Sequence, residues 1–246
     1  MLCRKAAISS ANRLRRTQVV IRCQGSVTSD SASGFDRVGI EGRAEAGTLM
    51  ADEPKPLPRM KPNHRRILEA VLFLISEAAR RGIYVTEYDI DKSIFVADVS
   101  HLNKYGRPIT YDNFVAMRDG PVPSFTRDVL QPGFKPRPFY NEEWPPWERV
   151  PSPPDGKLAH KFINPKREPN LRALSKSDTQ ELSQALSIVK AKGFHGTKKW
   201  THDHPAYVAV WPDKATGGAF PMDYAKLFDE PDPDTVKDLE FSSKHT

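Results

Sequence analysis

Ten of the chain's 22 prolines lie within residues 131–170. Because proline lacks a backbone N–H and restricts the residue before it, a long helix or central strand cannot persist through this segment. The segment also holds aromatic residues, which is unusual for a solvated linker: Phe134, Phe139, Tyr140, Trp144, Trp147 and Phe162. We therefore expect a Pro/Trp-rich insert at about 131–170 that packs on its own domain, with a docking surface for a partner as the alternative.

Two helices are expected before the insert. Residues 63–82 place apolar side chains along one broad helical stripe, with Asn63 as the N-cap and Gly82 as the residue that ends the helix. The second helix is expected to begin at Thr86, where a Thr-x-x-Asp pattern resembles a capping box, and to end at Gly106.

Order is expected to return after the insert. Ser175 is the predicted N-cap of a helix that ends at Gly193, and one or two short helices follow it, interrupted before Pro205. Beyond Pro212 the chain is polar and acidic, so we expect its end to be a loose tail.

These patterns predict a mainly α-helical fold with a small β-hairpin element. The hairpin is expected around the Asp119-Gly120-Pro121 turn, and a short helix is expected over residues 124–130. The expected domains are an N-terminal arm at 1–60, a folded domain at 61–212 that contains the insert, and a polar tail at 213–246.

The positive charge of the chain belongs to its first residues. The net charge is +6, and residues 1–29 contain six Arg and Lys residues and no acid, so the remaining residues sum to zero. We interpret 1–60 as a disordered arm, or as residues called in error before a true start at Met50, with an organellar targeting segment as a further alternative. Both cysteines, Cys3 and Cys23, fall in this arm, which excludes disulfides and Cys-based zinc sites from the folded body.

No segment of the sequence has the length and apolarity of a membrane span. The longest apolar run, residues 70–75, is far shorter than the roughly 20 residues that a spanning helix needs. We expect a soluble, cytoplasmic protein without a membrane partner.

Enzymatic chemistry finds little support in the sequence. His195, His202 and His204 lie within ten residues of one another, but a third ligand at diagnostic spacing is missing, and a histidine that bonds the backbone explains His202 equally well. Glycine-rich phosphate loops and nucleophile elbows are absent as motifs. We predict that the protein is not an enzyme and uses no cofactor or metal, with a metal-dependent hydrolase at the three histidines as the weakest alternative.

One stretch of the body resembles a known family. Residues 95–122 read FVADVSHLNKYGRPITYDNFVAMRDGPV. This run resembles the signature of the Panacea domain, the SocA-like antitoxin domain: a helix that ends in His-Leu, then Tyr-Gly-Arg-Pro-Ile-Thr, an aromatic-containing strand and Gly-Pro-Val. The Leu174-Ser-x-Ser-Asp helix start and the Thr201-His202 pair resemble the C-terminal half of the family. The resemblance covers about 65–211, interrupted by the insert.

The resemblance implies a non-enzymatic antitoxin of prokaryotes and mobile genetic elements. Members of the family neutralise a co-encoded toxin protein, often by direct binding, and some act as adaptors that present the toxin to a protease. Tyr, Trp and Arg concentrate interface energy, so the candidate partner-binding residues are Tyr105, Arg107, Trp144 and Trp147. Each has a structural alternative, because the first two could hold the corner after the second helix and the tryptophans could cover the core.

A second function of a different class is a DNA-binding regulator of its own operon. The basic N-terminal arm carries this alternative, helped by basic clusters in the body at Arg65-Arg66, Arg80-Arg81 and Lys198-Lys199-Trp200. Because small basic clusters in a neutral domain are usually solvated helix faces, we regard nucleic acid as the less favoured partner.

Overall fold

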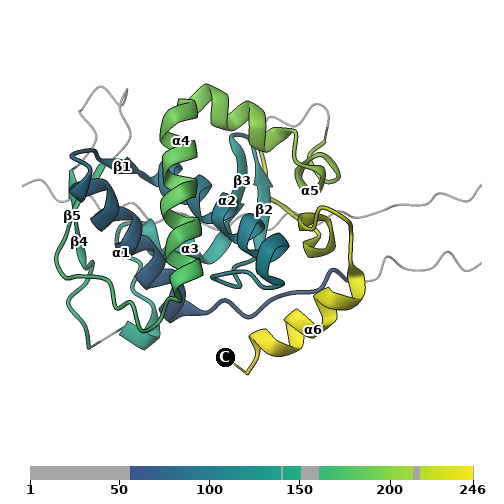
Figure 1. The fold of residues 1–246 in the computed structure, drawn as a ribbon, viewed down its shortest axis with the longest axis horizontal. Helices are drawn as coiled ribbons and strands as arrows, with labels where there is room; N and C mark the ends of the chain where they lie inside the picture. Colours follow the sequence, from purple (N-terminus) through teal and green to yellow (C-terminus); the bar gives the residue numbers. More distant parts are fainter. Residues whose placement is uncertain (1–55, 140, 151–160, 213–216, 246) are drawn as a thin grey trace, which may run out of the picture. The chain divides into compact units, whose positions relative to one another are not determined.

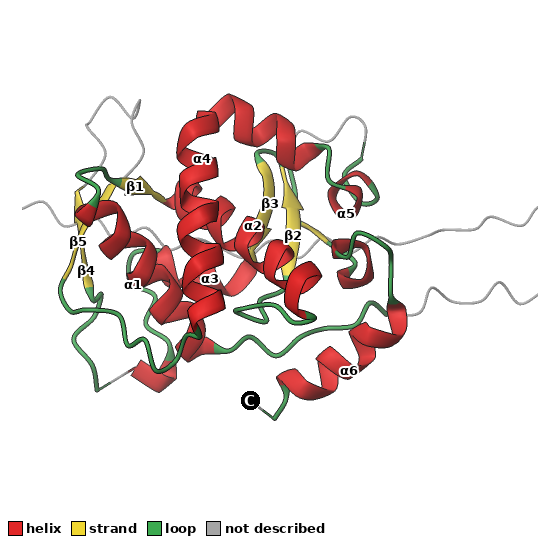
Figure 2. Cartoon of the chain, in the orientation of Figure 1, coloured by secondary structure: helices red, strands yellow, loops and turns green. Residues whose placement is uncertain are grey.

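The computed structural model describes residues 56–139, 141–150, 161–212 and 217–245. Helices dominate this part of the chain, and the strands are short (Figures 1 and 2). The helices are α1 (His64–Arg80), α2 (Glu87–Tyr105), α3 (Ser124–Leu130), α4 (Lys176–His202), α5 (Pro205–Val208) and α6 (Pro233–Ser243), with 3₁₀ turns η1 (Arg137–Phe139) and η2 (Tyr224–Leu227). The strands are β1 (Val85–Thr86), β2 (Phe114–Met117), β3 (Gly120–Pro123), β4 (Trp147–Val150), β5 (Lys161–Pro165) and β6 (Phe220–Pro221).

The caps that the sequence predicts for α1 and α2 are confirmed. The Asn63 side chain accepts a hydrogen bond from the backbone N–H of Arg66, and Thr86 forms a reciprocal capping box with Asp89. Gly106 ends α2 in the left-handed conformation, with φ of 72°, which glycine adopts without steric cost. Local sequence therefore sets the ends of both helices.

Helix α4 begins as predicted and bends at the glycine expected to end it. Ser175 and Asp178 form a second capping box at its start. Gly193 has φ of 62° and ψ of −174°, so the helical path is broken there, and a further helical segment runs from Phe194 to His202. Figure 1 shows α4 bending over toward α5, and the break before Pro205 falls where the sequence placed it.

Two small antiparallel sheets flank the helices. The predicted hairpin is confirmed as β2 and β3, and β6 joins it in the order β3-β2-β6. The second sheet, β1-β5-β4, was not expected, because two of its strands belong to the Pro-rich insert. Each strand there has at most five residues, which agrees with the expectation that no long element persists among the prolines.

The insert packs on its own domain. Phe139, Trp147 and Phe162 are buried in the main hydrophobic core, and Phe134 and Trp144 pack against it. Tyr140 and residues 151–160 lie outside the described part of the chain. The first of the two interpretations of the aromatic insert, packing on its own domain, is therefore correct for these five aromatic residues.

The expectation of a loose tail after Pro212 is wrong for the part that the structure describes. Strand β6 pairs with β2, η2 buries Tyr224 and Leu227, and α6 buries Val236 and Leu239. At the end of α6, Ser243 accepts a hydrogen bond from the backbone N–H of Lys61, which precedes α1 in the chain. Isolated apolar residues in a polar segment give no periodic signal, and here their burial depends on partners far away in the sequence.

The predicted fold class, mainly α-helical with a small β-hairpin element, is confirmed. The N-terminal arm, up to residue 55 and with both cysteines, lies outside the described residues. Within those residues, no helix has the length and apolarity to cross a membrane.

Candidate functional site

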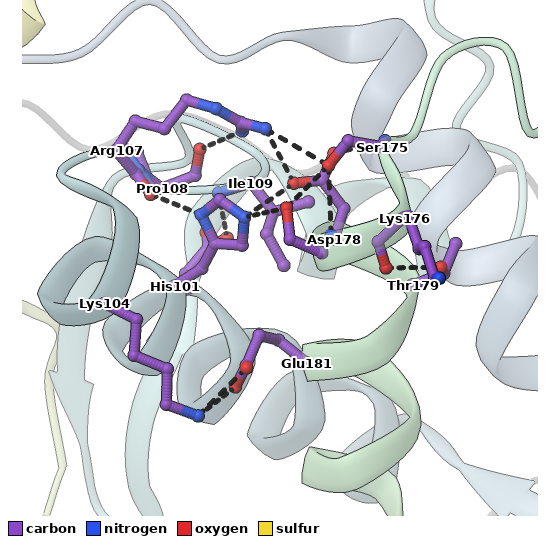
Figure 3. Close-up of polar contacts among 12 residues, drawn as sticks. His101, Lys104, Arg107, Pro108, Ile109, Ser175, Lys176, Asp178, Thr179 and Glu181 are labelled. Atoms are coloured by element: carbon purple, nitrogen blue, oxygen red, sulfur yellow. Dashed lines mark hydrogen bonds and ion pairs between the residues drawn. The ribbon is translucent and has the colours of Figure 1, made fainter.

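Asp178, in the first turn of α4, contacts hydrogen-bond donors from three other segments of the chain. Its carboxylate accepts hydrogen bonds from Arg66 of α1 at 2.5 Å and from Arg107 at 2.9 Å. The backbone N–H of Ser175 donates to it at 2.7 Å, and Nε2 of His101 lies 3.0 Å from its Oδ1. Figure 3 shows the ring of His101 and the guanidinium of Arg107 pointing toward this carboxylate. Asp178 thus joins α1, α2 and the segment after α2 to the start of α4.

The charge on this carboxylate is stabilised inside the protein. Burial opposes ionisation, but the hydrogen bonds from His101 and Ser175 and the charges of Arg66 and Arg107 hold the pKa of Asp178 well below its usual range. The Asp178 side chain is fully buried. A buried charge persists only when it is paired and hydrogen-bonded, so this cluster is an internal ionic junction.

His101 completes the junction from α2. Nδ1 donates to the carbonyl oxygen of Arg107 at 2.7 Å, and Nε2 also lies 3.0 Å from Oγ of Ser177. The ring is fully buried, so it is closed to a substrate. Both ring nitrogens therefore face groups of the protein itself.

Tyr105 and Arg107 lie at the corner between α2 and the following extended segment. Tyr105 is 49% exposed and its ring lies 4.5 Å from that of His101. Arg107 is partly buried and donates to Asp178 and to the carbonyl oxygen of Pro108. The contacts of Arg107 therefore fit a role in holding the corner after α2. The side chain of Tyr105 is exposed to solvent.

The Pro-Ile-Thr part of the motif is held by Asp98, a buried residue of α2. The backbone N–H groups of Ile109 and Thr110 donate to Oδ1 of Asp98 at 2.8 and 3.1 Å, and the Thr110 hydroxyl donates to Oδ2. Burial raises the pKa of Asp98 to about 7, although the bonds from Thr110 and Ile109 oppose this shift.

The raised pKa of Asp98 predicts a pH dependence of stability. A carboxyl with a folded-state pKa of about 7 and an unfolded value of 3.8 stabilises the fold below pH 3.8, and this contribution is lost as the pH rises toward 7. We expect Asp98→Asn to be less stable than the unmodified protein at acidic pH and to lose less stability between pH 4 and 7. Urea unfolding at pH 4.5, 6 and 7.5 measures both slopes, and equal slopes would contradict the assignment to Asp98.

A third buried carboxylate, Asp112, positions α3. Its oxygens accept from the backbone N–H groups of Phe125 at 3.0 Å and Thr126 at 2.8 Å, and from the Thr126 hydroxyl at 2.8 Å. Pro123, the residue before α3, provides no side-chain cap, so Asp112 satisfies the free N–H groups of this helix from outside it.

The Gly-Pro-Val corner contacts α2 and α4 closely. Nζ of Lys92, which is buried, donates to the carbonyl oxygen of Pro121 at 2.6 Å. Burial lowers the pKa of Lys92 to about 7, opposed by the charges of Asp91 and Asp119. Gly120 packs against Lys92 and against Thr201 of α4, so the two halves of the family-like pattern meet at this point.

Trp144 and Trp147 lie edge to face in one aromatic cluster, and they differ in exposure. Trp147 is 3% exposed, and its ring lies 5.7 Å from that of Trp144 and 6.0 Å from that of Phe162. Trp144 is half-buried, and its indole N–H donates to the carbonyl oxygen of Phe134 at 2.7 Å. For Trp147 the structure favours the alternative in which the tryptophan covers the core.

Replacing Trp147 should therefore destabilise the fold. Truncating a buried tryptophan to alanine costs about 3–5 kcal/mol through lost burial and the cavity that remains. We expect Trp147→Ala to lower the free energy of unfolding in urea by that amount, and Trp144→Ala to lower it by less. Unchanged unfolding of Trp147→Ala would assign this residue to a partner surface instead.

The three histidines of the metal hypothesis have separate structural surroundings. His195 is exposed, the His202 ring stacks on Tyr207 at 4.3 Å, and Nδ1 of His204 accepts from the backbone N–H of Ala206 to cap α5. Among the described residues, no three His, Cys, Asp or Glu side chains gather as a metal site would require.

The basic clusters of the body are mostly paired with carboxylates. Arg66 binds Asp178, Arg80 and Arg81 both bind Glu77, and Lys198 binds Asp119. Such pairs reduce the positive potential that a nucleic acid backbone would meet.

The central part of the chain has a counterpart among protein families. Residues 90–207 match the family model described as "Antitoxin SocA-like, Panacea domain". This range includes Asp98, His101 and Asp178, together with the Gly120–Thr201 contact. No curated protein and no solved structure matches the chain.

Proposed function

Because residues 90–207 match the family model of the antitoxin SocA-like Panacea domain, we propose that the protein neutralises a co-encoded toxin by binding it directly. The domain match carries this proposal, since it covers most of α2, the β2–β3 hairpin, α3 and the whole of α4. The mechanism is stoichiometric masking of the toxin, without a catalytic step.

The burial of three carboxyl groups of the domain, and their hydrogen bonds within the protein, support a binding role. Asp98, Asp112 and Asp178 are buried, and each accepts hydrogen bonds from the protein itself. In this proposal they hold a scaffold, and the exposed surface supplies the specificity.

Three of the four residues selected from the sequence remain proposed contacts. Tyr105 has the most open side chain of them, and Arg107 and Trp144 are each partly exposed. Aromatic and arginine side chains at the edge of a rigid scaffold are suited to anchor a partner. Trp147 is withdrawn as a contact, because it lies in the core.

Growth rescue tests this function. The full chain is induced alongside the neighbouring open reading frame, and growth and retention on an affinity tag are both scored. We expect the neighbour to be toxic alone, and to be rescued and retained by the chain. A toxic neighbour that is neither rescued nor retained would contradict the proposal. If rescue instead lowers the amount of toxin, and does so only when a cellular protease is active, the protein acts as a proteolytic adaptor.

The charge of residues 1–29 favours one second candidate, a DNA-binding regulator of its own operon. Binding through this arm would weaken steeply between low and moderate salt. Deletion of residues 1–49 would abolish it, whereas neutralisation of a toxin by the Panacea domain would survive that deletion.

A further inference from the structure

A groove lies between α2, both arms of the bent helix α4, and the start of α5. Its volume is about 550 Å³, within the range of pockets that bind ligands. Phe95, Val96 and Val99 of α2 form one wall, and Ile188 and Trp200 of α4 form another. Trp200 is 40% exposed, although a tryptophan in a monomer normally covers most of its surface. Figure 1 shows how the bend in α4 brings its second half toward α5.

The charged residues of the groove are unbalanced. Of the described residues that line it, Lys104 is the only lysine or arginine, and its Nζ is held by both carboxylate oxygens of Glu181 at 2.9 Å. Asp203 and Asp229 also line the groove and are exposed. Neither carboxylate forms an ion pair or hydrogen bond within the described residues, so two carboxylates at the edge of an apolar groove lack a bonded partner there. The nearby Lys192 does not line the groove, and its Nζ lies 5.0 Å from the centre of the Trp200 ring.

The position of Asp203 at the end of α4 is also unfavourable for a carboxylate. Asp203 is the C-cap of α4, where the partial negative charge of the helix disfavours a carboxylate and favours a cation. An acid there does not serve the stability of the helix. It is suited to a positively charged group that comes from outside the domain.

We propose that this groove receives a segment of the toxin that presents one or two large apolar side chains beside a lysine or arginine. The apolar side chain would cover Trp200 and Val99, and the cation would lie between Asp203 and Asp229. The complementarity of charge selects this occupant, since an uncharged ligand would leave both carboxylates unpaired in a less hydrated setting. This proposal rests on the proposed function, because it names the part of the toxin that the domain binds.

The test measures the affinity of full-length variants for the purified product of the neighbouring gene. We expect Trp200→Ala to weaken binding at least about tenfold, because a central tryptophan commonly dominates an interface. We expect the double variant Asp203→Lys with Asp229→Lys to weaken it at least as much, since a repulsive pair replaces an attractive one.

Matched controls lie on α6, away from the groove. Phe241→Ala removes an aromatic side chain that is 67% exposed, and Asp238→Lys reverses an exposed charge. Both should bind within twofold of the unmodified protein. Urea unfolding of every variant separates loss of binding from loss of fold, and Asp203→Lys should not destabilise α4.

Each outcome decides the proposal. If the unmodified chain binds and rescues, but the groove variants bind equally well, the groove is not the contact and the antitoxin function stands. If only Trp200→Ala weakens binding, the occupant is not basic and the proposal fails. A dimer in sedimentation that Trp200→Ala converts to a monomer would identify a second copy as the occupant, and a small molecule retained in native mass spectrometry would overturn the proposal likewise. If the unmodified chain neither binds nor rescues, both proposals fall together.

Discussion

Asp178→Asn is expected to destabilise the protein by about 3–5 kcal/mol, because it removes one partner of a buried ionic cluster and leaves the others uncompensated. Arg66, Arg107 and His101 all face the carboxylate, and an asparagine would turn an amide N–H₂ toward at least one of these donors. Helix α4 would also lose half of its capping box, since the backbone N–H of Ser175 donates to the same side chain.

The measurement for Asp178 is the free energy of unfolding in urea at neutral pH. Asp234→Asn is the matched control, because Asp234 pairs with Lys237 on the surface of α6 and such exposed pairs contribute at most about 1 kcal/mol. A loss below about 1 kcal/mol in Asp178→Asn would show that the cluster is not the element that joins α4 to the rest of the domain.

Gly120→Ala is the second substitution expected to have a large effect. Gly120 has φ of +106°, and a Cβ atom there would lie 2.7 Å from Oγ1 of Thr201 and 3.0 Å from Nζ of Lys92. Backbone strain and overpacking would act together, so we expect a loss of about 2–4 kcal/mol.

A control separates strain from crowding at Gly120. Gly82 also has a positive φ, of +68°, but a Cβ added there would have no atom within 4 Å. Gly82→Ala should therefore cost only about 1 kcal/mol. If the two variants lose equal stability in urea, the close approach of the hairpin to α4 carries no energetic weight, and the physical explanation of the Gly-Pro-Val corner is wrong.

The helix ends and the hairpin could be predicted because their causes are local. Asn63, Thr86 and Ser175 cap helices through side chains that bond within three residues, and Gly106 and Gly193 break them through their own backbone freedom. Such signals are present in a short window of sequence.

The buried polar residues could not be predicted in the same way. Asp98 and Asp112 read as ordinary surface acids, because their partners lie 11 to 14 residues away and become neighbours only in the folded chain. The one available signal was position, since Asp91 and Asp98 are seven residues apart on the face of α2 that also carries Ile94. The Asp178 junction joins residues 66, 101, 107 and 178, and no spacing pattern predicts it.

The structure of the C-terminal segment could not be predicted from the sequence for a related reason. Val236 and Leu239 are isolated apolar residues in a polar segment, a pattern that predicts a loose tail. Both are nevertheless buried in α6. Burial of α6 depends on a surface that the rest of the domain offers, and a sequence window contains no information about that surface.

The most direct test of neutralisation by masking is a titration of the purified toxin with the full-length chain, followed by calorimetry and by the activity of the toxin. Masking predicts a saturable complex of fixed stoichiometry, with toxin activity falling to zero at the same molar ratio that saturates binding. Toxin activity that declines without a complex, or at a small fraction of the stoichiometric amount, would contradict masking and indicate a catalytic or indirect mechanism.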